Sequence, residues 1–180
     1  MTSSSEPSPK VTLSPTRRDE CEALLGMFSQ DEVVKYTNFR NFSDSAALGQ
    51  FLDRFLKIGL GQPLQYGPYS IYLDNQIIGL CGLQQHNLDE GVAELWYILN
   101  RDYWKKGLAR QAIDLLINKA ADNKQLKTIF AEAVDINTAS WKILEKLGFS
   151  LNGTTKSGFK KGDITEDLRL YSYACPGIRA

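Results

Sequence analysis

The spacing of hydrophobic residues changes along the chain, and each change predicts a different element. Alternation at residues 11–13 predicts a short strand, and a helical pattern follows that Thr16 could cap and that extends to Phe28. Residues 31–60 keep helical spacing until Gly59 interrupts it. We expect the apolar positions of this stretch to belong to the core: Ala47, Leu48, Phe51, Leu52, Phe55 and Leu56.

The middle of the chain has the two-residue period of β-strands. Residues 69–73 and 77–83 are rich in strand-forming side chains and are joined by Asp74-Asn75, a pair typical of a tight hairpin. Residues 84–91 are expected to form a polar loop. Residues 92–99 form a third strand, in which Ala93, Leu95, Tyr97 and Leu99 face one side and Glu94, Trp96 and Ile98 face the other.

The last part of the chain alternates helices and strands. A helix is expected from residue 108 to about 121–123, a strand at 128–134, a helix at 138–147, and two strands from Phe149 onward around a turn at 160–163. The apolar stripe of the first helix is expected to contain Leu108, Ala112, Leu115, Leu116 and Lys119. Hairpins followed by strand, helix and strand predict a single α/β domain with a mixed, mostly antiparallel sheet and one parallel pair.

A short basic loop containing a glycine separates the third strand from its helix. Lys105, Lys106 and Arg110 lie near the helix start, where Asp or Glu would be preferred if nothing were bound. Free amides and the macrodipole place roughly half a positive charge at such an end, which favours a diphosphate. The pattern therefore predicts an anion site, while an ordinary cap at Asp102 beside solvated lysines is the alternative.

Composition limits the domain count and the partners. The 180 residues suit one domain, expected at 10–176 after a tail at 1–9. Twenty-one basic residues balance 21 acidic ones, so the net charge provides no long-range attraction to nucleic acid or membrane, and neither is an expected partner. No apolar run approaches the roughly 20 residues of a membrane helix, and the first residues lack a secretion signal, so a cytoplasmic location is expected.

The metal-binding and redox side chains are few. Cys21, Cys81 and Cys175 are far apart, and His86 is the only histidine. Three separated cysteines favour a reducing compartment over a disulfide framework, and no metal site is expected.

A second segment, residues 137–149, completes a recognisable combination. Asn137 is a good N-cap, Ser140 would occupy the third helical position, and Gly148 would end the helix before a strand. Together with the basic loop, this segment resembles the GNAT acyl-CoA N-acetyltransferases, and more closely their RimJ/RimL-type branch, which modifies protein N-termini. The resemblance implies the GNAT fold, with a splayed parallel pair at the cofactor cleft.

The resemblance also implies the cofactor, acetyl-CoA, with coenzyme A as product. In the family, a loop of pattern Gln/Arg-x-x-Gly-x-Gly/Ala binds the diphosphate. Gly107 and Ala109 match this pattern. Trp104 stands at the Gln/Arg position, which resembles the Tyr-Trp-x-Lys-Gly form of the branch. The implied cofactor-binding residues are Ile98, Leu99, Trp104, Lys105, Lys106, Gly107, Leu108, Ala109, Arg110, Asn137 and Ser140.

Two catalytic residues follow from the same resemblance. Glu94 matches the acid of the branch's Ala-Glu-x-x-Tyr strand and would act as base, with pairing to a nearby cation as the alternative reading and Glu132 as a weaker second choice. Ser140 would hydrogen-bond or protonate the leaving thiolate, or would only cap the helix or bind the pantetheine arm. A backbone amide of residues 97–99 is expected to hold the oxyanion.

One departure from the resemblance concerns a second catalytic glutamate. Some protein-acetylating relatives carry a second catalytic glutamate where this chain has Ser157, Gly158 and Phe159, so catalysis could depend on Glu94 or on water. His86 and Tyr171 are lesser candidates for proton transfer.

Three functions remain open at this stage. The preferred one is acetyl transfer to a protein N-terminal amine in a ternary complex; the others are acetyl transfer to a small amine and acyl-CoA sensing without turnover. Convergence of Asp44, Asp53, Asp89 and Glu90 on the cleft would favour a polyamine. Specificity is expected from residues 31–60, 84–91 and 157–166, and the protein could be a monomer or a homodimer.

Overall fold

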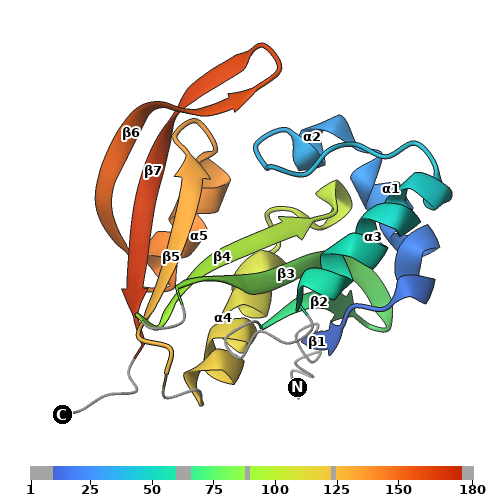
Figure 1. The fold of residues 1–180 in the computed structure, drawn as a ribbon, viewed down its shortest axis with the longest axis horizontal. Coiled ribbons are helices and arrows are strands. Elements are labelled where there is room, and N and C mark those ends of the chain that lie inside the picture. The colour runs from blue at the N-terminus through green and yellow to red at the C-terminus, as the bar shows by residue number, and fades with distance from the viewer. Residues whose placement is uncertain (1–9, 60–65, 88–89, 123–124, 176–180) are drawn as a thin grey trace, which may run out of the picture.

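One seven-stranded mixed sheet organises the chain, with helices on both faces (Figure 1). This computed structural model describes residues 10–59, 66–87, 90–122 and 125–175. The strand order is β1-β2-β3-β4-β5-β7-β6. The strands are β1 (Val11–Pro15), β2 (Tyr66–Leu73), β3 (Gln76–Asn87), β4 (Val92–Leu99), β5 (Thr128–Val134), β6 (Ser150–Lys161) and β7 (Ile164–Ala174). The helices are α1 (Cys21–Phe28), α2 (Asp31–Val34), α3 (Ser45–Gly59), α4 (Leu108–Ala121) and α5 (Thr138–Lys146), with 3₁₀ turns η1 (Arg18–Glu20) and η2 (Arg101–Tyr103).

The predicted hairpin between β2 and β3 is confirmed. Asp74 and Asn75 both have positive φ, at 48° and 68°. That conformation suits the right-handed twist of a two-residue hairpin, and it is tolerated best by short polar side chains and glycine. The predicted polar loop at 84–91 is wrong in its first half, because β3 continues through Asn87. Antiparallel pairing with β4 over this stretch satisfies the backbone of these polar residues.

The N-terminal helices differ from the prediction in two ways. Thr16 does not cap a helix; its side-chain oxygen meets the Ser70 hydroxyl at 3.1 Å, and the chain enters α1 through η1. Residues 31–60 are not one helical stretch, because residues 35–44 separate the short α2 from α3. Asp44 ends this connection by accepting a 2.7 Å hydrogen bond from the Ala47 amide, as an N-cap does.

The parallel pair predicted from the strand-helix-strand order is formed by β4 and β5. Their pairing runs only from Val92 opposite Thr128 to Leu95 opposite Ala131. Beyond this point β4 stays paired with β3, and β5 stays paired with β7. The two strands therefore separate at their carboxyl ends, where ligands of such sheets bind.

The two faces of the sheet carry separate cores. One contains Leu95 with buried residues of α4, and the other contains Ile98 with buried residues of α1 and α3. The alternation predicted for β4 is therefore confirmed. The stripe predicted for α4 is partly wrong: Leu115 is 41% exposed and Lys119 is exposed, whereas Ile113 and Ile117 are buried. In the described part of the chain, no helix combines the length and apolar character needed to span a membrane.

Candidate active site

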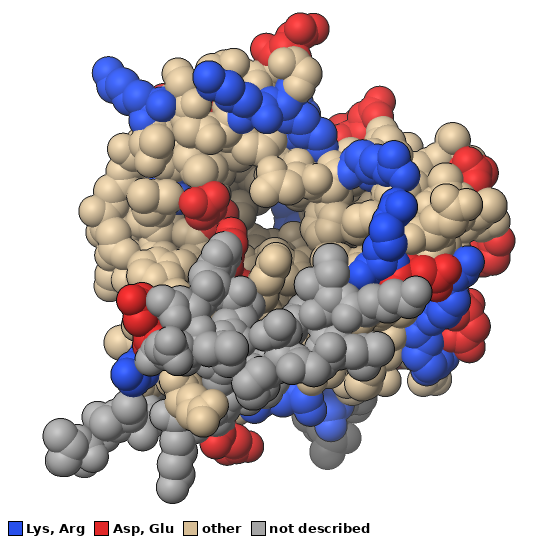
Figure 2. Space-filling view, viewed as in Figure 1, with Lys and Arg blue, Asp and Glu red and all other residues tan. Residues whose placement is uncertain are grey.

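A cavity of about 1230 Å³ opens where β4 and β5 separate. It is lined from both sides of β4, since Glu94 and Trp96 as well as Leu95 and Tyr97 contribute to its wall. The cavity therefore passes through the gap in the sheet. Figure 2 shows the molecule hollowed at this position.

The first turn of α4 lies at one end of this cavity. Gly107 is the N-cap, with φ 75°, and this helix end has neither a side-chain cap hydrogen bond nor an acidic residue in its first turn. A Cβ built on Gly107 would meet no atom within 4 Å, so the approach to the first-turn amides is open. An open, basic helix start of this kind fits a diphosphate.

The loop before α4 does not have the cap that the alternative reading expected, and Lys106, a predicted cofactor residue, does not line the cavity. Asp102 is not the cap of α4; it belongs to η2, and its amide donates to the Asn100 side chain at 3.0 Å. Lys106 turns back to donate from Nζ to the Asp102 carbonyl at 2.9 Å, whereas Lys105 and Arg110 line the cavity.

Trp104 has a structural contact in this loop. Its Nε1 donates to the carbonyl of Leu99 at 2.8 Å, which joins the loop to the end of β4. The remaining predicted cofactor residues line the same cavity: Ile98, Leu99, Leu108, Ala109, Asn137 and Ser140.

The start of α5 lines the same cavity as the start of α4. Asn137 is the N-cap by position, as predicted, but its side chain makes no capping hydrogen bond. Ser140 occupies the third helical position. Beside it, the indole of Trp141 donates to the Asp135 carbonyl at 3.0 Å and the guanidinium of Arg169 lies 4.2 Å from the ring centre, so this helix start is held on β5 and β7.

The side chain of Tyr97 lines the cavity, and the sequence patterns did not single it out. Its hydroxyl lies 2.8 Å from the Ser140 hydroxyl, at hydrogen-bonding distance. Burial raises the pKa of Tyr97 to about 12, partly offset by the hydrogen bond with Ser140. Tyr97 therefore keeps its proton at neutral pH. The available signal was its position in β4, on the face that packs against α4 and α5.

The lesser candidates for proton transfer have different outcomes. Tyr171 is fully buried and donates to Glu145 at 3.1 Å, and it does not line the large cavity. Burial raises the pKa of Tyr171. This residue belongs to the core, and Glu145 of α5 holds its hydroxyl. The side chain of His86 lies outside the described residues.

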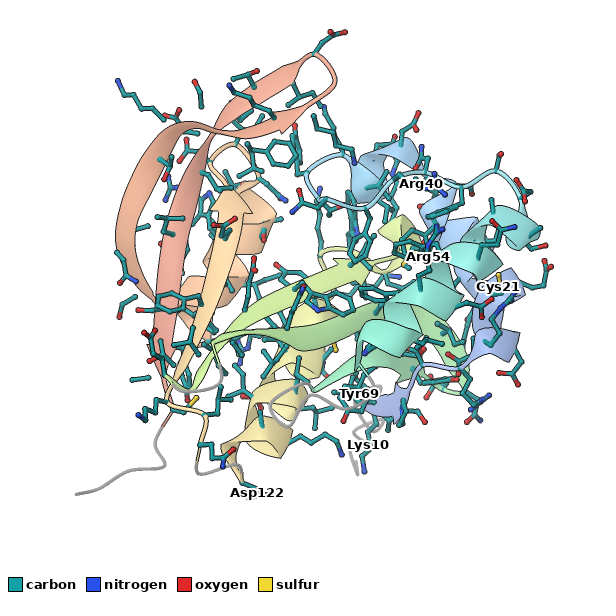
Figure 3. All side chains as sticks on the ribbon, viewed as in Figure 1. Lys10, Cys21, Arg40, Arg54, Tyr69 and Asp122 are labelled. Atoms are coloured by element: carbon teal, nitrogen blue, oxygen red, sulfur yellow. The ribbon has the colours of Figure 1, made fainter. Side chains whose placement is uncertain are left out.

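The opposite end of the cavity is lined by carboxylates and aromatic rings. Glu94 and Glu132, from the two separating strands, both contribute to the wall. Phe51 and Phe55 of α3 do so too, so the prediction that they belong to the core describes only one side of each half-buried ring. Figure 3 shows side chains of α3 and β4 filling the space between these elements.

A bridge between two distant segments covers this end. Lys161, at the tip of the β6–β7 hairpin, donates from Nζ to the carbonyls of Val34 (2.7 Å), Thr37 (3.1 Å) and Phe39 (2.5 Å). Phe159 also meets Tyr36 in an edge contact at 6.5 Å between ring centres. The hairpin in Figure 1 accordingly reaches from β6 and β7 toward α2.

Of the acids expected to favour a polyamine, those that the structure describes do not converge on the cavity. Asp44 caps α3, and Asp53 pairs with Arg18 at 2.9 Å. Asp44, Asp53 and Glu90 do not line the cavity. Asp89 lies outside the described residues. Within the described ranges, no group of three or more His, Cys, Asp or Glu side chains could hold a metal ion.

Comparisons with known proteins agree with this geometry. The Acetyltransferase (GNAT) domain family matches residues 10–150. The uncharacterized N-acetyltransferase p20 of Bacillus licheniformis is 26% identical over 163 residues, which cover 91% of this chain and 92% of p20.

Two solved structures share the fold at low sequence identity. RimL, a ribosomal L7/L12 alpha-N-protein acetyltransferase in complex with coenzyme A, has a TM-score of 0.85 at 13% identity and covers 93% of this chain and 96% of its own. Spermidine N-acetyltransferase from Vibrio cholerae, in complex with CoA and spermine, has a TM-score of 0.79 at 16% identity, with the same coverage of 93% and 96%.

Proposed function

The chain belongs to the GNAT acetyltransferase family, and from this membership we propose that it transfers the acetyl group of acetyl-CoA to the α-amine of a protein or peptide N-terminus. Acetyl-CoA-dependent N-acetyltransferase activity is the family's function. The acceptor is the part that we propose. The overall similarity to RimL, an alpha-N-protein acetyltransferase, supports it.

The donor would bind along the side of the cavity formed by Gly107–Arg110, Asn137, Ser140 and Tyr97, which we call the donor side. The free amides at the start of α4 would bind the diphosphate, with Lys105 and Arg110 adding positive charge. This geometry would direct the thioester into the gap between β4 and β5. The main-chain amides at the end of β4, beyond its last pair with β5, are available there to an oxyanion.

Acetyl transfer then requires that a proton leave the amine and that the thiolate be stabilised as it departs. The amine nitrogen attacks the thioester carbonyl carbon, a C–N bond forms, and the C–S bond breaks with its electron pair on sulfur. The proton released by the nitrogen passes to Glu94, directly or through water. An N-terminal amine has a pKa of about 7.7 to 8, so a weak base is sufficient.

The departing sulfur would be stabilised by the Tyr97–Ser140 pair. If Tyr97 donates to Ser140 Oγ, the Ser140 proton can point into the cavity toward the thiolate. Because Tyr97 keeps its own proton, the pair remains a donor throughout the physiological pH range. Ser140 would be the catalytic residue, and Tyr97 would position it.

One observation carries this proposal. A single cavity joins an open helix start, a serine–tyrosine hydroxyl pair and a carboxylate on the opposite face of the same strand. Coenzyme binding alone would not require a hydroxyl pair and a carboxylate on opposite faces of β4. The arrangement therefore favours catalysis over acyl-CoA sensing.

The direct test measures thiol release from acetyl-CoA with peptide acceptors. We expect release with peptides that have a free N-terminus and none with the same peptides acetylated at the N-terminus. Mass spectrometry should locate the added acetyl group on the α-amine. Binding of acetyl-CoA without thiol release from any amine would contradict enzymatic function, and equal release with the blocked peptides would contradict the N-terminal acceptor.

A further inference from the structure

The acceptor end of the cavity has a composition that restricts the amine. Six aromatic side chains from the chain around α2 and α3, from β4 and from the β6–β7 hairpin line it, beside polar residues of the same segments, and we call these six the acceptor side: Tyr36, Phe39, Phe51, Phe55, Trp96 and Phe159. Resting on the proposed function, we infer that the acceptor carries a bulky, neutral, apolar or aromatic group next to its amine. For a peptide, this group is the side chain of the first residue.

The position of Trp96 relative to Glu94 supports this inference. Both side chains lie on the same face of β4, two residues apart, which is a spacing of roughly 7 Å along a strand. An amine near Glu94 therefore brings its nearest substituent against the indole. A small polar substituent such as a serine side chain would leave this apolar surface exposed to water.

The rings around Trp96 form a continuous surface. Trp96 meets Phe39 at 5.6 Å and Phe55 at 5.2 Å between ring centres, both edge to face. Phe55 stacks on Phe51, one helical turn earlier, at 5.3 Å and an interplanar angle of 18°. All four rings are half-buried and line the cavity, so each is packed on one side and accessible on the other. Aromatic surfaces of this kind bind aromatic and large aliphatic groups.

The charges of the cavity as a whole disfavour a polycation. The carboxylates of the described lining are Glu32, Glu94 and Glu132, and the lysines and arginines of the same lining, which include Lys105 and Arg110 of the donor side, outnumber them. Glu32 is also paired with Arg101 at 2.9 Å. Figure 2 shows basic side chains between the opening and α3, where Figure 3 labels Arg40 and Arg54. A polyamine with several ammonium groups would be repelled there, whereas a single neutralised amine on an apolar group would not.

The test compares acceptors that differ only beside the amine. Peptides identical except for a first residue of Phe, Leu, Ser or Ala would be assayed by thiol release, together with 2-phenylethylamine and spermidine. We expect kcat/KM to be at least tenfold higher with Phe or Leu first than with Ser or Ala first, and higher with 2-phenylethylamine than with spermidine. A preference for Ser, Ala or spermidine would overturn the inference while leaving acetyl transfer intact, whereas no thiol release with any amine would contradict the proposed function itself.

Variants of the wall provide an independent check. In Phe55→Ala, the ratio of kcat/KM for the Phe-first peptide to that for the Ser-first peptide should fall at least fivefold. Phe55→Leu, which preserves most of the packing, should lower the same ratio less. The matched control is Phe130→Ala, which removes an exposed ring outside the large cavity and should leave the ratio unchanged. If the Phe55 variants lower kcat/KM for the Phe-first and the Ser-first peptide by the same factor, the ring contributes to stability alone and its role in selection is overturned.

Discussion

The donor side and the acceptor side of the cavity are built by different means. The donor side depends on main-chain geometry: the helix start at Gly107, the cap position at Asn137 and the free edge of β4. The acceptor side depends on large side chains that come together from segments more than 100 residues apart in sequence, as Tyr36 and Phe159 do. The donor side therefore suits a ligand common to a whole family, and the acceptor side suits a ligand that differs between its members.

The largest expected effect concerns the hydroxyl pair on the donor side. Ser140→Ala should lower kcat about 100-fold or more, since the departing thiolate would lose its hydrogen-bond donor, while the KM for acetyl-CoA should change little. Tyr97→Phe should lower kcat about tenfold. Steady-state thiol release at saturating substrates measures both, and Thr138→Ala, which removes an exposed hydroxyl two residues earlier in α5, is the control.

The pH profile sharpens this prediction. Because burial raises the pKa of Tyr97 to about 12, the wild-type enzyme should show no loss of kcat from this group below about pH 10. Wild-type rates in both hydroxyl variants would remove Ser140 and Tyr97 from the mechanism.

The second prediction tests the main-chain geometry directly. Gly107→Val should raise the KM for acetyl-CoA roughly 30-fold, because the side chain would occupy the open approach to the first-turn amides and disfavour φ 75°. Gly162→Val is the matched control, since Gly162 also has positive φ and open space around its Cβ but lies in the β6–β7 turn. Both variants should lose about 1–2 kcal/mol of unfolding free energy, but only the first should lose coenzyme affinity. An equal rise of KM in both would contradict the diphosphate site.

The third prediction concerns the carboxylate between the two sides. Glu94→Gln should lower kcat/KM for the amine about tenfold, a modest effect because water can also accept the proton. The loss should be smaller at high pH, where more of the free amine is already neutral. Glu132→Gln, which alters the other cavity carboxylate near the strand gap, should change the rate less. The reverse ranking would make Glu132 the base.

The smallest catalytic effect is expected at the bridge over the acceptor side. Lys161→Met would remove a donor from three carbonyls, of which that of Val34 keeps its hydrogen bonds from Thr37, and should lower the unfolding free energy by about 1–3 kcal/mol. The KM for the amine should rise about threefold, while the KM for acetyl-CoA should stay constant. Chemical denaturation and steady-state kinetics measure these quantities, with the exposed Lys156→Met as control. A rise in KM for acetyl-CoA alone would contradict the proposed division of the cavity into a donor side and an acceptor side.

Sequence reasoning anticipated the donor side because its signals are local. The strand at Val92–Leu99, the glycine at the start of α4 and the position of Ser140 in α5 each follow from patterns within a few residues. The same holds for the parallel pair, which the strand-helix-strand order requires. Their roles in binding and catalysis remain predictions.

The acceptor side could not be anticipated because its contacts are not local. Phe51 and Phe55 have the spacing of core residues, and only the fold shows that one side of each ring faces the cavity. The contacts of Lys161 could not be predicted, because in the sequence Lys160 and Lys161 are two lysines of an expected turn. On the donor side, the contact of Tyr97 could not be predicted for the same reason, since its hydrogen-bond partner lies 43 residues away.

The separation of β4 and β5 also has a consequence for the order of kinetic events. Since residues from both faces of β4 line the passage between the strands, acetyl-CoA and the amine would enter it from opposite faces of the sheet if the proposed assignment of the two sides holds. Neither obstructs the route of the other, so we expect association in random order and intersecting lines in double-reciprocal plots. After turnover each product can leave from the face at which its precursor entered, without waiting for the other to depart.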